Sequence, residues 1–348
     1  MVLQRFASVC HPPKRAGLCS ASALLAVCMA LFPLPSLAAH LGKHAEYRLS
    51  FDHHVPETAA CRIAETTAWL DALKKTTDAL SAAKLVQGGA GETTGRQALV
   101  SAVFIPTVYS TSKGRQVLAQ VRLNTPQRTV TDRLRKMLHE REMLALRAEM
   151  LKLEREKAEE ARNLIERPAA LRRAAAGGAA ARYERIALLA EQLEALWLLG
   201  SALPQREDGR WREPQTALPV LQQAAALAPD YAPLMYMLGE VLLQLDRPQD
   251  ALEELDKALA LRPELAGALY TRGLAYLRLQ LPTLAERDLS SALEWDASHA
   301  AWWRARGALR MIRNEIGPMC EDFMQACARG DCEGLAVARE RGSCLAEK

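Results

Sequence analysis

The chain has 348 residues, of which 5% are aromatic, and its abundant alanine and leucine indicate a mainly helical fold. Its 45 Lys and Arg and 41 Asp and Glu give a formal net charge of +4, or 4 − 3 = +1 without the three basic residues among positions 1–38. A chain this close to neutrality lacks the basic face with which general nucleic-acid binders release counterions, so we expect no nucleic-acid partner.

Residues 1–38 have the pattern of a secretory signal peptide. Lys14 and Arg15 precede an apolar run at 23–32, which is too short to cross a bilayer, and residues 36–39 supply small side chains for cleavage. We expect cleavage after Ala38 or Ala39 and export, which in a bacterial cell places the protein in the periplasm. The alternative is an uncleaved signal that anchors the chain in the membrane. We expect no other membrane-crossing run.

Residues 39–128 predict a small α+β domain. Residues 46–51 alternate polar and apolar side chains as a half-buried strand does, and 58–85 carry helical periodicity. The runs 98–109 and 117–123 are rich in β-formers, and the turn signal between them predicts a hairpin. The expected order is strand, helix, strand, strand, with the helix laid on the sheet.

Two features of this region suggest ligand sites, and we interpret neither as one. Residues 90–97 superficially resemble a phosphate-binding loop, but Arg96 and Gln97 replace the required Lys and hydroxyl, so we expect a plain loop. Four histidines have no Cys or carboxylate at tight metal spacing, so we expect a solvated cluster and no metal or cofactor. These are His40, His44, His53 and His54.

Residues 129–192 predict a helical connector. Opposite charges three residues apart support an exposed helix over 130–167, which Pro168 ends, and a second helix is expected from about 180 to 202. Neither apolar stripe is regular enough for a long coiled coil, so we expect the two helices to fold back as an antiparallel hairpin. Dimerisation through this connector is the alternative.

Residues 193–299 repeat at a period of 34. Within the run from Leu234 to Gly239, Met235 to Gly239 recur 34 positions later as Leu269 to Gly273, and a weaker copy ends at Gly200. From each glycine to the next alanine landmark the spacing is 12 in two units and 17 in the first, which therefore has five extra residues. The other landmarks are Ala217, Leu221, Ala224 and Pro229; Ala251, Leu255, Ala258 and Pro263; and Ala285, Leu289 and Ala292.

This pattern resembles the tetratricopeptide repeat family, in which helix–turn–helix units stack and use small residues where helices touch. The resemblance implies a concave face that binds a protein or peptide. Arg272 departs from the pattern, which places a large apolar residue there. The implied partner-binding residues are Trp197, Ser201, Tyr236, Glu240, Gln244, Tyr270, Leu274, Arg278 and Arg304. For Trp197 and Tyr270 the alternative is that they fill gaps between repeats.

Residues 300–348 predict an end cap. Residues 300–316 have the pattern of a further first helix without a second helix, and two short helices follow, which form a Cys-rich hairpin. Four cysteines allow three disulfide connectivities in an oxidising compartment. An antiparallel hairpin favours the nested pairs Cys320–Cys344 and Cys327–Cys332, with a zinc site as the alternative.

The sequence therefore predicts an exported scaffold that binds a protein or peptide in the cell envelope. A structural subunit that oligomerises through the connector or the α+β domain is the alternative, and the oligomeric state is open. We identify no catalytic residue, because no Ser or Cys nucleophile lies in a motif and no nucleotide fingerprint is present. An enzyme is the less favoured class.

Overall fold

The computed structural model describes residues 44–82, 93–104, 106–123, 141–166, 178–207 and 210–344. The expected signal peptide and His40 lie outside these ranges. The chain divides into two compact units: Met1–Ala45, Trp69–Thr107 and Val121–Ala148 in one, and Glu46–Ala68, Val108–Gln120 and Glu149–Lys348 in the other, as far as these ranges are described.

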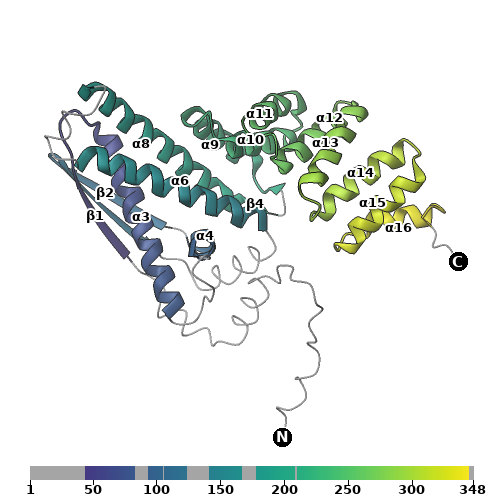
Figure 1. The fold of residues 1–348 in the computed structure, drawn as a ribbon, viewed down its shortest axis with the longest axis horizontal. Coiled ribbons are helices and arrows are strands. Elements are labelled where there is room, and N and C mark those ends of the chain that lie inside the picture. Colours follow the sequence, from purple (N-terminus) through teal and green to yellow (C-terminus); the bar gives the residue numbers. More distant parts are fainter. Residues whose placement is uncertain are drawn as a thin grey trace, which may run out of the picture. The chain divides into compact units, whose positions relative to one another are not determined.

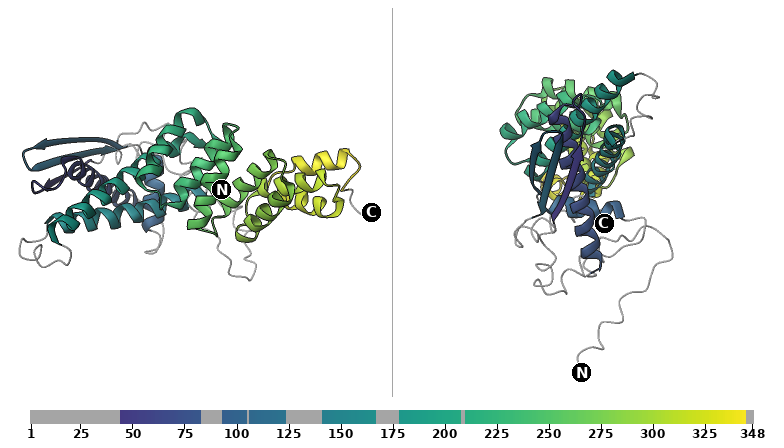
Figure 2. Two further views of the ribbon diagram at one scale, coloured as in Figure 1. Left: turned by 90° about the horizontal axis from the view of Figure 1, so that it is seen from above. Right: turned by 90° about the vertical axis from the view of Figure 1, so that its left-hand side faces the viewer.

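The N-terminal region is α+β, as expected, with one additional helix. Its three strands have the order β1-β3-β2. On α3, Glu65 accepts a 2.6 Å hydrogen bond from Ser110 of β2, and Glu57 accepts one from Ser112, so α3 lies against the sheet (Figure 2). The elements are β1 (His44–Ser50), α3 (Glu57–Ala82), α4 (Thr93–Val103), β2 (Pro106–Lys113) and β3 (Gln116–Leu123).

The predicted strand over residues 98–109 is wrong in its first half. Residues 98–103 belong to α4, and β2 begins only at Pro106. Ala98, Val100 and Val103 are all at most 2% exposed. A short apolar run that is buried on all sides has no alternation, so periodicity alone does not distinguish a strand from a helix. Residues 93–97, which we expected to lie in a plain loop, also belong to α4, and residues 90–92 lie outside the described ranges.

The connector is an antiparallel pair of helices, α6 (Arg141–Glu166) and α8 (Gly178–Ala202). Lys157 donates to Gln192 at 2.7 Å, and Arg185 donates to Glu160 at 2.8 Å. The residue numbers of the contacts increase along α6 while those of their partners on α8 decrease, which is the pattern of an antiparallel hairpin.

Helix α8 is continuous across the expected boundary between residues 192 and 193. Its N-terminal part pairs with α6, and its C-terminal part packs on α9 as the first helix of the first repeat. The segment Ala180–Gln205 is long and apolar enough to cross a membrane by length and composition, contrary to the expectation that no such run follows the signal. Leu189, Leu193 and Leu199 are at most 1% exposed, so packing uses this apolar surface.

The rest of the chain consists of paired helices (Figure 1). A proline begins the second helix at Pro214, Pro248 and Pro282, where its missing N–H costs nothing. The helices after α8 are α9 (Pro214–Leu227), α10 (Ala232–Gln244), α11 (Pro248–Leu261), α12 (Ala266–Arg278), α13 (Pro282–Trp295), α14 (Ala300–Ile312), α15 (Ile316–Ala328) and α16 (Glu333–Glu340). The short strands β4 (Arg206–Glu207) and β5 (Arg210–Trp211) lie between α8 and α9.

One close contact recurs within the helix pairs. In three of these pairs, a Cβ placed on a glycine of the first helix would come within 3 Å of a large side chain on the second helix. The contacts are Gly239–Leu255, Gly273–Leu289 and Gly307–Phe323. The last of these joins α14 to α15, so the expectation that α14 lacks a second helix is wrong. The helix that follows without a described partner helix of its own is α16.

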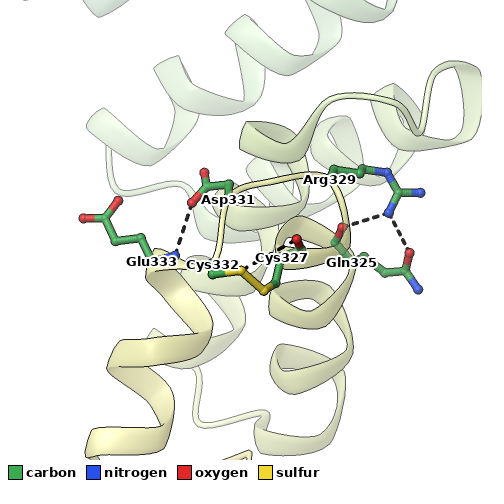
Figure 3. The surroundings of a disulfide bond; sticks show 6 residues. All are labelled: Gln325, Cys327, Arg329, Asp331, Cys332 and Glu333. Atoms are coloured by element: carbon green, nitrogen blue, oxygen red, sulfur yellow. Dashed lines mark hydrogen bonds between the residues drawn. A yellow bond between two sulfur atoms is a disulfide. The ribbon is translucent and has the colours of Figure 1, made fainter. Parts of the chain in front are cut away.

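Two disulfides hold α15 to the segment that contains α16. Cys320 is joined to Cys344 and Cys327 to Cys332, which are the pairs that the nested arrangement predicts. Figure 3 shows the second bond across the turn between the helices, where the Asp331 carboxylate accepts from the Glu333 amide. Beneath the disulfides lies a small apolar cluster of Met319, Phe323, Leu335 and Ala338.

Arg272, the departure from the family pattern, has a structural partner. Its guanidinium donates to Asp288 at 2.6 and 3.2 Å and to Asp256 at 2.7 Å, and Asp288 is only 2% exposed. Thirty-four residues later, Arg306 donates to Asp322 at 3.0 and 2.8 Å. An arginine and a buried aspartate therefore replace an apolar contact in two successive units.

We expect Gly239→Ala to lower the free energy of unfolding by about 1–3 kcal/mol, because its Cβ would lie 2.6 Å from Leu255 Cγ. Gly317→Ala is the matched control, since a Cβ there meets nothing within 4 Å and alanine has a higher helix propensity than glycine. Urea unfolding measures both. Equal effects of the two substitutions would contradict the close-contact account.

Candidate partner-binding groove

The groove residues expected in the second and third units and on the end helix lie on α10, α12 and α14. Burial raises the pKa of Tyr270, and the charges of Arg304, Glu240 and Arg210 all act on its hydroxyl. Arg304, Tyr270 and Glu240 come from three successive first helices, whereas Arg210 comes from β5. Charges from α10, α14 and β5 therefore all act on Tyr270, and α10 contacts both α12 and β5.

The two residues expected in the first unit have different surroundings. Trp197 is 40% exposed and lies under the Arg62 guanidinium of α3, 4.9 Å from the ring centroid. Arg62 also forms an ion pair with Glu194 on α8. Ser201 donates to its own helix, to Leu198 O at 2.7 Å. Trp197 thus contacts α3, an element outside the repeats, and does not fill a gap between repeats.

In the second unit, Tyr236 and Glu240 already have an intramolecular partner. Arg206 of β4 donates to the two Glu240 carboxylate oxygens at 2.8 Å each and to the Tyr236 hydroxyl at 3.2 Å. The Tyr236 hydroxyl donates to Glu240 at 2.7 Å. Arg206, Tyr236 and Glu240 are 6%, 5% and 9% exposed, so this charge pair is removed from water.

Gln244, the third groove residue of this unit, holds the backbone of β5. Its side-chain oxygen accepts from Trp211 N at 2.9 Å, and its side-chain nitrogen donates to Trp211 O at 2.6 Å. The Trp211 side chain is 1% exposed. Residues 232–243 of α10 are all buried, because α9, α11, α12 and β5 surround this helix.

The five extra residues of the first unit account for this arrangement. They allow the link between α8 and α9 to form the antiparallel β4–β5 hairpin, with Arg206 opposite Trp211. The groove of the second unit is therefore filled by the chain itself. The phase shift in the sequence placed an insertion between the two helices of the first unit, but did not predict that it packs on the second unit.

Residues 212–264 match the tetratricopeptide repeat family model. This segment is a tetratricopeptide repeat. A search of curated proteins found no significant match to the chain.

Solved structures show low similarity over part of the chain. The MamA segment 41-end from Desulfovibrio magneticus RS-1 is 20% identical, with 50% of this chain and 94% of that chain covered and a TM-score of 0.35. YrrB, described as a TPR protein with an unusual peptide-binding site, is 20% identical, with 46% of this chain and 81% of that chain covered and a TM-score of 0.36. PilF of Pseudomonas aeruginosa is 17% identical, with 47% of this chain and 76% of that chain covered and a TM-score of 0.36. All three TM-scores are below 0.5, so no functional property is transferred.

The third tetratricopeptide unit is partly open. Tyr270 stacks on Trp302 of α14 with ring centroids 5.3 Å apart, so it packs between repeats. Leu274 is half-buried, and the Arg278 side chain is 61% exposed. Among the described residues it pairs with Asp246, which is 81% exposed, at 2.9 Å. An exposed ion pair of this kind contributes little to stability, so Arg278 is available to a ligand.

On α14, the expected groove residue Arg304 is engaged by the capping segment. Its guanidinium lies 3.0 Å from Asp331 and also contacts Glu333, both on the disulfide-held turn. The predicted set also lacks one exposed position of this register. Ile312 lies 34 residues after Arg278, in the same repeat position, and is 78% exposed. Extending the register one unit further would have found it.

The described residues do not form a metal centre. Within residues 44–82 and the other described ranges, no three His, Cys, Asp or Glu side chains are placed to hold an ion. The rings of His53 and His54 lie 3.7 Å apart between centroids and are tilted by 42°, and the His54 centroid lies 4.9 Å from that of Tyr183, so these two histidines lie beside α8.

We expect Tyr236→Ala to lower the free energy of unfolding by about 3 kcal/mol, because it removes a buried ring and its hydrogen bond to Glu240. Ser201→Ala is the control on an exposed groove position and should change stability by less than about 0.5 kcal/mol. Thermal unfolding followed by circular dichroism measures both. An unchanged melting temperature for Tyr236→Ala would mean that its ring faces an open groove.

Proposed function

We propose that the chain is an exported, non-enzymatic scaffold that holds a protein or peptide partner in the cell envelope. The observation that carries this proposal is the pair of equivalent groove positions on α12 and α14, where Arg278 and Ile312 are exposed. Stacked helix pairs present such positions along one surface, and a cation beside an aliphatic side chain suits a peptide that has a carboxylate and an apolar anchor.

The binding surface in this proposal is narrower than the whole concave face. Tyr236, Glu240 and Gln244 hold the β4–β5 hairpin, and Arg304 holds the capping turn. The partner therefore contacts the part of α12 and α14 between these two intramolecular contacts. Leu274, half-buried one turn before Arg278, supplies apolar area beside it.

Export is the second part of the proposal. The signal pattern of residues 1–38 supports it, and so do the two disulfides, because disulfides persist in oxidising compartments such as the periplasm. An uncleaved signal would add a membrane anchor at the N-terminus without changing the groove.

A structural subunit is the second candidate function. The strand order leaves β1 and β2 at the edges of the sheet, and Tyr109 on β2 is 58% exposed. An edge strand with unpaired backbone groups can pair with another chain. A sedimentation series that gave the same oligomer at every concentration would favour this candidate over the scaffold.

We expect the full-length chain with Arg278→Glu and Ile312→Ser to recover about tenfold less partner from envelope extract than the wild-type chain, because both open groove positions lose their chemistry. Trp295→Ser is the control, since Trp295 is 63% exposed at the end of a second helix. Quantitative pull-down with mass spectrometry measures recovery. A partner that is retained by the groove variant and lost by the control would contradict this binding surface.

We expect the protein to be recovered from the periplasmic fraction with an N-terminus at Ala39 or His40, because cleavage follows Ala38 or Ala39. Cell fractionation and N-terminal sequencing measure this. Recovery from the cytoplasm with Met1 intact would contradict export while leaving the groove proposal standing.

A further inference from the structure

The β4–β5 hairpin is an insertion that the repeat does not need. In the pairs α10–α11, α12–α13 and α14–α15, three residues join the first helix to the second. In the first unit the link between α8 and α9 is longer and crosses to the neighbouring unit, where it lies on α10. Its contacts therefore describe what the groove of the second unit recognises.

The first recognised feature is a guanidinium. Glu240 is 9% exposed, and a buried carboxylate without a cation is strongly unfavourable. Arg206 meets it with two parallel hydrogen bonds of 2.8 Å, and Tyr236 is within 3.2 Å of the same side chain. A planar fork satisfies this geometry better than an ammonium group does, so the site selects arginine over lysine.

The second recognised feature is a backbone that carries a large aromatic side chain. Gln244 reads only the N–H and C=O of Trp211, which any residue offers. The Trp211 ring is 1% exposed, which defines a closed apolar site for it. Its Nε1 is buried and has no hydrogen-bond partner among the described residues, so the ring leaves one polar group unsatisfied when it is docked.

The hairpin has little structure of its own. Each strand has two residues, with Arg206 opposite Trp211 and Glu207 opposite Arg210, and one further backbone bond joins Arg212 N to Gln205 O at 2.8 Å. Isolated two-stranded hairpins are marginal in water, so the contacts to α10 are what keep it in place.

We infer that the β4–β5 hairpin is an intramolecular occupant of a second binding groove, and that its replacement is a turn-forming partner segment with an arginine five residues before a tryptophan. The inference rests on the proposed scaffold function, to which it adds a partner class. The partner's arginine would take the place of Arg206 against Glu240, its backbone would bind Gln244, and its aromatic ring would enter the Trp211 site.

The tether explains why the groove is closed when the partner is absent. A segment linked to its own site competes at a high effective concentration. A partner segment therefore replaces the hairpin only if it binds the groove tightly or if the hairpin's own contacts are weakened. The experiment therefore uses the full-length chain with Arg206→Ala and Trp211→Ala, which retains Glu240, Tyr236 and Gln244.

The probe is a fluorescent peptide with the sequence of residues 203–214, LPQREDGRWREP. Anisotropy titration should show that the double variant binds it about tenfold or more tightly than the wild-type chain does. A matched peptide in which alanine replaces the Arg and the Trp should bind at least about tenfold more weakly. Adding Glu240→Gln to the double variant should weaken binding of the Arg-containing peptide. A folded double variant that ignores the probe, or binds both peptides equally, overturns the inference.

A measurement on the wild-type chain covers the case in which the double variant does not fold. In hydrogen exchange followed by mass spectrometry, the hairpin amides should exchange at least about tenfold faster than those of α10 and α11, because the hairpin opens without global unfolding. Exchange of all three segments together would make the hairpin a permanent part of the fold. Both experiments are independent of Arg278 and Ile312, so their failure leaves the scaffold proposal separately testable.

Discussion

The close approach of paired helices is the constraint on which the repeat region depends. Gly239, Gly273 and Gly307 each face a large side chain on the following helix, at a distance that leaves no room for a Cβ. The contact recurs in the three successive pairs α10–α11, α12–α13 and α14–α15, and because a helix pair cannot bury its apolar face alone, these pairs stack on one another. The 34-residue spacing of the groove positions follows from the same register, so partner chemistry is arranged by packing.

Within that register, buried charges are used in two different ways. Arg272 and Arg306 pair with aspartates of their own helix pairs and replace an apolar contact of the repeat. Arg206 instead comes from an insertion and neutralises Glu240 on the neighbouring unit. A buried pair offers stability only while both members are present, so the first kind fastens a unit together and the second kind makes a groove depend on its occupant.

The sequence predicted what is periodic and missed what is not. The units around Gly239 and Gly273 could be found because small residues recur at fixed spacing, whereas the fourth pair was missed because Met319 and Phe323 stand where earlier units have alanine and leucine. Tyr236 and Glu240 were predicted to contact a partner and instead contact Arg206 of the β4–β5 hairpin, which has no period and left only a phase shift in the sequence. Helix α4 was missed because its apolar run is short and buried throughout.

The continuity of α8 has a geometrical consequence. One helix without an intervening loop belongs both to the α6–α8 pair and to the first repeat. Each residue of an α-helix turns the chain by about 100° and advances it by about 1.5 Å. The number of residues in α8 therefore sets the direction in which the repeats face relative to α6. Inserting or deleting one residue in α8 would rotate that direction by about 100°.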